Sequence, residues 1–333
     1  MAAYRSTGKE LRKSPKGLIA GILALFLAAG AGYGAKLVLD DMVTLTPADS
    51  QEVTISVPDE TESLAEESDE IDFGMESLSP DDVRQGPLIL VNSDYPTEDA
   101  TDGLATVFAK KSDIVTVMDM TVRLNEEAIE AINKMAADFQ TATGHTDLFV
   151  LSGFVSKDEQ KRRYEADLQR TGNETSTSFD LPGCNDFESG YTFELALFPN
   201  GKLTDFTAEG DYEWITEHCA EYGLIQRFPE DKSEQTGKAG NPTVFRYVGT
   251  PHAWYMKENN LCLEEYSALL ESYPYDGEHL MITDQLSVPF EIYYFSVDPN
   301  DQEQEAVIPV PIGYKFNVSG DNKHGFIVTI ELE

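Results

Sequence analysis

The sequence predicts an α+β fold, with a membrane-spanning helix and an acidic linker before the main domain and a small β-rich extension after it. Three observations favour this order. An uncharged apolar stretch lies near the N-terminus, residues 40–82 contain no Lys or Arg, and helix-like and strand-like patterns alternate from residue 86 onward. The 333 residues suffice for a sizeable core. The expected parts are a basic tail at 1–16, an anchor at 17–39, a linker at 40–85, a domain at 86–275 and an extension at 276–333.

The apolar stretch at 17–35 has the composition of a transmembrane helix. It reads GLIAGILALFLAAGAGYGA, close to the roughly twenty residues that span a bilayer core. Basic residues precede it and Asp40 and Asp41 follow it, so the positive-inside rule places the N-terminus in the cytoplasm and the rest outside. We therefore expect a single-pass protein of the cell membrane. A cleaved signal peptide is the alternative, because small residues crowd positions 29–35.

The charge balance restricts the possible partners. The chain has 24 Lys and Arg against 60 Asp and Glu, a formal net charge of -36, so a nucleic acid backbone would be repelled. The linker at 40–85 is rich in acidic and hydroxyl residues and poor in large apolar ones, which predicts disorder. Cys184, Cys219 and Cys262 are too few and too scattered for a disulfide framework and are expected to be small buried residues.

Helix and strand patterns define the main domain. A helix is expected over 124–144 with Asn125 as its cap, and a second helix begins after Ser156, with the capping-box spacing to Glu159. Further helices are expected over 211–223 and 252–270. The expected strands cover 87–92, 147–153, 191–198 and 244–249 in the domain, and 287–297, 314–320 and 325–332 in the extension.

Five segments, in order along residues 86–273, resemble the VanY-type zinc D-alanyl-D-alanine carboxypeptidases of bacterial cell walls. They are GPLILVNSDYP, LSGFVSKDEQKRRY, PGCNDFESGYTFEL, WITEHCAEYGLIQRFP and NPTVFRYVGTPHAWYMKENNLCLEEY. The resemblance implies a zinc D,D-carboxypeptidase-like core domain. It also implies an enzyme that removes the terminal D-alanine of peptidoglycan stem peptides with a zinc held by His, Asp and His, a glutamate base and a substrate-binding Arg.

The positions that match these functional residues are altered in this chain. The three zinc ligands correspond to Phe187, Glu194 and Val244, the base to Asn241 and the arginine to Val155. Phenylalanine and valine offer no lone pair to a metal, and an amide does not accept a proton at neutral pH. We therefore expect no intact catalytic residue and no bound cofactor, although zinc is the cofactor of the family.

Other residues of these segments remain candidates for a ligand cleft. They are Ser152, Ser156, Gln160, Glu194, Arg246 and Tyr247. Arg246 could bind a substrate carboxylate or form an internal ion pair, and both interpretations stay open. A replacement cation site of Asp186, Glu188 and Glu194 is conceivable, although such acids more often form a solvated face. His252 is expected to pack in the core, as are Trp214, Trp254 and Tyr255 unless they form the wall of a binding site.

The sequence thus favours a membrane-anchored extracytoplasmic relative of D-alanyl-D-alanine carboxypeptidases that is catalytically inactive and binds peptidoglycan stem peptides or a cell-envelope protein. One alternative is an active metallo-carboxypeptidase that uses displaced ligands, such as Glu194 with nearby acids or His252. Another is a structural or regulatory module whose acidic surface docks onto a basic partner.

Overall fold

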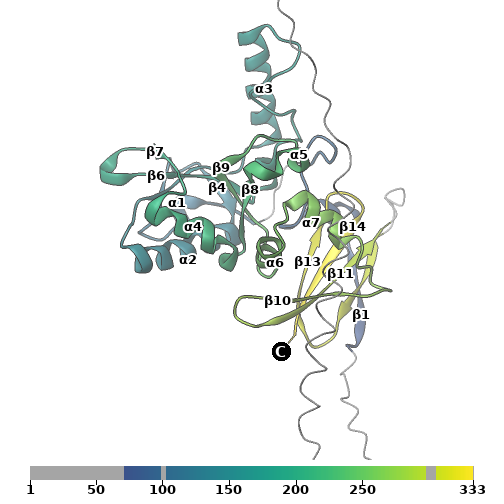
Figure 1. Cartoon of the computed structure of the whole chain (residues 1–333). Coiled ribbons are helices and arrows are strands. Elements are labelled where there is room, and N and C mark those ends of the chain that lie inside the picture. The colour runs from purple at the N-terminus through teal and green to yellow at the C-terminus, as the bar shows by residue number, and fades with distance from the viewer. Residues whose placement is uncertain (1–70, 99–102, 298–304, 333) are drawn as a thin grey trace, which may run out of the picture. The chain divides into compact units, whose positions relative to one another are not determined.

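The central sheet of the computed structural model has five strands in the order β3-β5-β6-β9-β8, and β7 pairs with β6 beside them (Figure 1). Their bounds are β3 Thr116–Val117, β5 Leu148–Ser152, β6 Thr192–Leu197, β7 Thr204–Asp205, β8 Leu224–Phe228 and β9 Asn241–Tyr247. β3 runs parallel to β5, and the other pairs are antiparallel. The structure describes residues 71–98, 103–297 and 305–332, all within one compact unit.

Helix α2 (Glu126–Thr143) covers one face of this sheet. Its apolar stripe shares one core with Phe193, Leu195 and Phe245. Because side chains alternate along a strand, Glu194 and Val244 lie on the other face. The predicted cap is confirmed, since the Asn125 Oδ1 accepts a hydrogen bond from the Glu127 amide at 3.0 Å. Further elements are α1 (Val107–Lys110), α3 (Lys157–Thr171), α4 (Glu213–His218), α5 (Ser233–Thr236), β2 (Leu104–Thr106) and β4 (Arg123–Asn125).

The predicted helix over 252–270 is two helices, α6 (His252–Glu258) and α7 (Leu263–Leu270). Asn260 between them has a φ of 49°, in the left-handed region where asparagine is tolerated. The Leu261 amide then turns back to the Met256 carbonyl at 2.8 Å. A single left-handed residue is enough to end one helix and redirect the chain into the next.

A second sheet forms the C-terminal part, in the order β10-β11-β14-β13. Its strands are β10 Leu280–Thr283, β11 Pro289–Ser296, β13 Lys315–Gly320 and β14 Gly325–Glu331, so the three predicted strands are confirmed. β1 (Phe73–Leu78) pairs with β12 (Ala306–Pro311) beside it. The prediction of a disordered linker up to residue 85 is therefore wrong for 73–84, where a short 3-10 helix (Pro80–Arg84) follows β1. Phe73, Leu78 and Val83 pack into the core of this sheet. The acidic composition of the segment gave no indication of this packing.

The predicted transmembrane helix and most of the predicted linker lie outside the described residues. Among the residues that the structure does describe, no helix has the length and apolar character needed to cross a membrane.

Residues 88–91 are buried, but the strand predicted over 87–92 is wrong, because side chains from other segments form hydrogen bonds with its backbone. The Arg246 Nη2 donates to the carbonyls of Pro87 and Ile89 at 3.0 and 2.8 Å. The Leu88 amide donates to the Ser319 Oγ at 3.0 Å, and the Asn322 Nδ2 donates to the Leu90 carbonyl at 2.9 Å. These bonds join the segment to both sheets. Leu88 and Leu90 also share one apolar core with Ile225 and Ile327, so the C-terminal sheet packs against the main domain.

A buried charge cluster holds these parts together. The Asp186 Oδ1 lies 2.8 Å from the Arg246 Nη1 and 3.1 Å from the Arg227 Nε, and Arg227 also pairs with Glu264 of α7 at 2.7 Å. Asp186, Arg227 and Arg246 are nearly inaccessible to solvent. Burial raises the pKa of Asp186, but the two guanidinium groups outweigh it and hold the pKa below its usual value. The internal ion-pair interpretation of Arg246 is confirmed.

We predict that Asp186→Asn lowers the free energy of unfolding by roughly 3–5 kcal/mol, because it leaves two buried guanidinium groups with too little negative charge. Urea unfolding followed by circular dichroism measures this. Arg163→Gln removes a solvent-exposed ion pair with Glu159 and serves as the control, with little expected change. An Asp186→Asn protein as stable as the Arg163→Gln protein would show that the cluster does not support the fold.

Candidate functional site

The first site segment is a short 3-10 helix, Asp186–Ser189, that is fixed by its own caps. The Asn185 Oδ1 accepts a hydrogen bond from the Phe187 amide at 3.1 Å, and Gly190 ends the turn at a φ of 80°. The Phe187 carbonyl accepts a hydrogen bond from the Val155 amide at 3.4 Å. Phe187 and Val155, the positions predicted to correspond to a zinc ligand and to a substrate-binding arginine, are thus brought together. Both side chains are apolar, so neither of these two positions can bind a metal ion or a carboxylate.

The second site segment lies across three neighbouring strands. Ser152, Glu194 and Val244 are cross-strand partners on β5, β6 and β9. The Ser152 Oγ and the Thr243 Oγ1 each lie 3.3 Å from a Glu194 carboxylate oxygen. The Thr243 Oγ1 is also 2.8 Å from the Asn241 Oδ1. Glu194, Thr243 and Asn241 therefore form one polar row that begins at a ligand position and ends at the base position.

These residues do not fit a zinc ion. A catalytic zinc needs three protein ligands with lone pairs, and of the three ligand positions only Glu194 supplies one. Asp186 is held between two arginines, and the buried Glu188 carboxylate accepts hydrogen bonds from the Gly183 amide at 2.8 and 3.0 Å. Within the described ranges, no three His, Cys, Asp or Glu side chains gather closely enough to hold a metal ion. The conceivable cation site of Asp186, Glu188 and Glu194 does not form there.

Three of the residues predicted to line the cleft do not lie in it. Gln160 is fully buried and connects the Asp180 carbonyl to the Asn185 side chain, at 2.8 and 3.0 Å. Arg246 is fully buried in the charge cluster. Tyr247 alternates with Arg246 along β9 and packs toward the α2 side of the sheet, against Tyr191. The predictions for Gln160, Arg246 and Tyr247 are therefore wrong.

Ser156 serves as the cap of α3, where its Oγ accepts a hydrogen bond from the Glu159 amide at 3.3 Å. The predicted start of this helix is confirmed. Of the residues expected in the cleft, Ser152 and Glu194 remain next to the altered ligand positions.

His252 is a structural residue of the core. Its Nδ1 lies 2.8 Å from the Tyr266 hydroxyl and its Nε2 lies 3.0 Å from the Thr329 hydroxyl, so both ring nitrogens have partners. Burial lowers its pKa to about 3. The packing interpretation is confirmed, and His252 cannot serve as a displaced metal ligand in this arrangement. Trp214, Trp254 and Tyr255 likewise pack against the apolar cores, and Cys219 and Cys262 are buried while Cys184 is half-buried.

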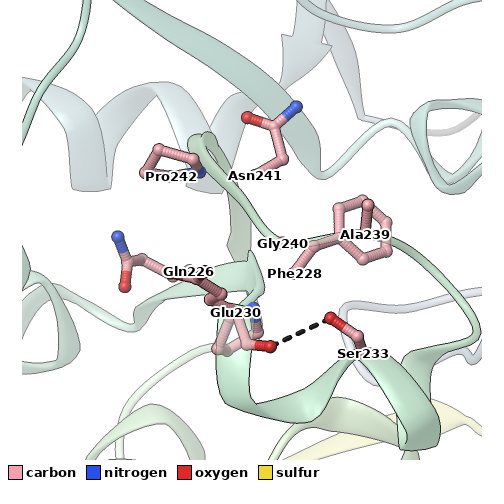
Figure 2. A pocket seen from close by; sticks show the side chains of 9 residues that line it. Gln226, Phe228, Glu230, Ser233, Ala239, Gly240, Asn241 and Pro242 are labelled. Atoms are coloured by element: carbon pink, nitrogen blue, oxygen red, sulfur yellow. Dashed lines mark hydrogen bonds between the residues drawn. The ribbon is translucent and has the colours of Figure 1, made fainter. Parts of the chain in front are cut away.

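A pocket beside Asn241 was not expected from the sequence. Figure 2 shows Asn241 and Pro242 across from Glu230 and Ser233. The pocket has a volume of about 660 Å³ and lies where the turn after β8 faces the start of β9. Its main lining residues are Gln226, Phe228, Glu230, Ser233, Asn241 and Pro242. Sequence reasoning also missed Thr243, although this hydroxyl lies within the same motif as Asn241.

Comparison with known proteins places the chain in a family. Residues 121–250 match the VanY family model, described as D-alanyl-D-alanine carboxypeptidase. A D-alanyl-D-alanine carboxypeptidase of Enterococcus faecium is 30% identical over 259 residues, which cover 76% of this chain and 78% of that protein. The chain belongs to the VanY family.

Another relative and a solved structure agree with membership of the VanY family. A bifunctional D-Ala-D-Ala dipeptidase and carboxypeptidase of Enterococcus gallinarum, VanXYC, is 29% identical over 185 residues, which cover 54% of this chain and 92% of that protein. The crystal structure of the D,D-dipeptidase VanXYg, in complex with a D-Ala-D-Ala phosphinate analogue, superposes with a TM-score of 0.67 at 25% identity. The superposed region covers 78% of this chain and 100% of the VanXYg chain. Residues 86–275 alone are too few to make up this share of the present chain. The expected D,D-peptidase fold is confirmed.

The low pKa of His252 predicts a stability that depends on pH. Below about pH 6.5 the unfolded chain binds a proton that the folded chain does not bind until about pH 3, so this residue makes stability fall as the pH falls through that window. In this window His252 alone changes the free energy of unfolding by up to about 1.4 kcal/mol per pH unit. Urea unfolding between about pH 4 and pH 6 should give a smaller slope for His252→Gln than for the natural chain. Equal slopes would mean that His252 is protonated in the folded protein.

Proposed function

We propose that this VanY-family member does not hydrolyse D-Ala-D-Ala and instead binds peptidoglycan stem peptides at the surface where its relatives carry out catalysis. The observation that carries the proposal is the pair of apolar side chains, Phe187 and Val244, at two of three ligand positions. Asn241 stands where a base is needed, and its amide cannot take a proton from water at neutral pH. The remaining carboxylate, Glu194, is in contact with hydroxyl groups.

The selective pattern of change supports a retained binding role. Residues that position the site keep several buried partners each. Gln160 bonds with Asp180 and Asn185, and the two terminal nitrogens of Arg246 bond with Asp186 and the 87–89 backbone. The residues that would do the chemistry are the ones replaced. A scaffold under no functional constraint would lose both kinds of residue together.

Two alternatives differ from this proposal in what they require. An active enzyme with displaced ligands needs a metal, and the candidates His252 and Asp186 are both fully engaged elsewhere. A module that docks onto a basic protein is favoured by the net charge of -36 alone. Crosslinking in the native envelope distinguishes this alternative from peptide binding. A docking module should be crosslinked mainly to a basic protein, and a peptide-binding protein should not.

We predict that the full-length chain releases no D-alanine from a peptide ending in D-Ala-D-Ala, with or without added zinc. Loss of the base alone costs about 10² to 10⁴ in rate, and the loss of two ligands removes the metal chemistry as well. Released D-alanine is measured with a coupled oxidase assay. Zinc-dependent release by the natural chain would overturn the proposal.

The matched variant restores the residue types of the family at four positions: Phe187→His, Glu194→Asp, Asn241→Glu and Val244→His. Equilibrium dialysis should find about one zinc per chain in this variant and none in the natural chain, because only the variant offers a full ligand set. Thermal unfolding with and without zinc provides a second reading, since a bound metal raises the unfolding temperature. An equal zinc content in both proteins would contradict the assignment of the ligand positions.

The proposal includes anchoring in the cell membrane through residues 17–35, with the folded part outside the cell. We predict that the chain sediments with membranes and that protease added to spheroplasts digests residues after 40. A chain with Leu23→Arg and Leu25→Arg should leave the membrane fraction, because charge at the centre of a span is costly. Mass spectrometry of the mature N-terminus tests the signal-peptide alternative, in which a chain that starts after about residue 35 would be found.

A further inference from the structure

The pocket beside Asn241 is negatively charged. Glu230 is the one charged side chain in its lining, and the remaining lining residues are neutral. The two lysines of the same loop are engaged elsewhere, since Lys232 lies 2.9 Å from Glu265 and Lys238 pairs with Asp180. Among the described residues, no cation pairs with Glu230. The pocket therefore favours a cationic group over an anionic one.

Glu194 does not line the pocket, but Thr243 links it to Asn241 at the pocket wall, and its carboxylate has spare hydrogen-bonding capacity. The hydroxyl of Thr243 carries one hydrogen, and its Oγ1 is closer to the Asn241 Oδ1, at 2.8 Å, than to the Glu194 Oε1, at 3.3 Å. Glu194 thus shares one of its two hydroxyl donors with Asn241, and it pairs with no cation in the part of the chain that the structure describes. A half-buried carboxylate in this state is suited to a donor with a positive charge.

Two amide side chains of the pocket are also uncommitted. The Asn241 Oδ1 is occupied by Thr243, but its Nδ2 has no partner among the described residues, and neither has the Gln226 side chain. Amides of this kind match the alternating donors and acceptors of an extended peptide. Phe228 and Pro242 supply apolar surface for the methylene groups of a long side chain.

We propose that this pocket, together with the adjoining Glu194, binds a primary ammonium group of a peptide, such as a lysine side chain. This inference rests on the proposed peptide-binding function and names the chemical group that the site selects. An ammonium group has three donors on a compact charge, so it can reach a carboxylate and an amide oxygen at once. The site thus recognises the peptide by binding its amine, and it does not act on the D-alanine end.

The experiment titrates the full-length chain, kept in detergent, with two peptides that differ in one charge. They are Nα-acetyl-Lys-D-Ala-D-Ala and the same peptide acetylated on the lysine Nε. We expect the free amine to bind roughly tenfold more tightly, which is about 1.4 kcal/mol, because acetylation removes the charged donor of the hydrogen bond to the carboxylate. The difference should shrink between about 20 and 300 mM salt.

Variants locate the site. Glu194→Gln and Glu230→Gln should each remove most of the preference for the free amine, whereas Glu234→Gln, an exposed residue outside the pocket, should retain it. If Glu234→Gln weakens the preference equally, net charge and not the pocket selects the amine, and the inference fails. It also fails if both Glu194→Gln and Glu230→Gln behave like the natural chain.

The outcomes distinguish this inference from the proposed function. Equal binding of both peptides overturns the amine selectivity and leaves peptide binding intact. Binding of neither peptide overturns the amine inference and the stem-peptide function together.

Discussion

The fold depends on one buried carboxylate, Asp186, held between two guanidinium groups. Three charges with little access to water are stable only when each faces an opposite charge at short range, and the cluster with Glu264 meets this condition. The arrangement has a structural consequence. Asp186 starts the helical turn that carries Phe187, and Arg246 lies two residues from Val244, so the same ion pair fixes two of the predicted ligand positions.

This cluster makes the site geometry independent of a metal. Zinc ligands that face one another without a cation would leave unsatisfied polar groups and repelling charge in a half-buried place. Here Val244 is almost fully buried and pairs with Glu194 across β6 and β9, where an aliphatic side chain needs no partner. The ligand set and the scaffold are thus separable. Under the proposed function, changes at the predicted ligand positions would alter the chemistry without disturbing the charges that maintain the fold.

Sequence reasoning succeeded where the determinants were local. Asn125 and Ser156 begin helices because a side-chain oxygen reaches an amide two or three residues ahead, which a short stretch of sequence reveals. It failed where the partner is distant. The segment 87–92 reads as a strand, but its carbonyls are satisfied by Arg246 and Asn322, more than 150 residues away. Phe73 is similar, since its core lies in strands near the C-terminus.

The candidate site shows the same division. The assignment of the five altered positions rests on the motifs and stays a prediction. Side-chain alternation along β9 would have excluded Tyr247, because Arg246 and Tyr247 point to opposite faces. The pocket could not be foreseen, because it requires β8 to pair with β9 and the intervening loop to fold back on Asn241. Its charge follows from pairings outside it. Lys232 and Lys238 pair with Glu265 and Asp180, so Glu230 has no paired cation among the residues that the structure describes. The electrostatic character of a site is set by which of its neighbours are already paired, and composition alone does not contain that information.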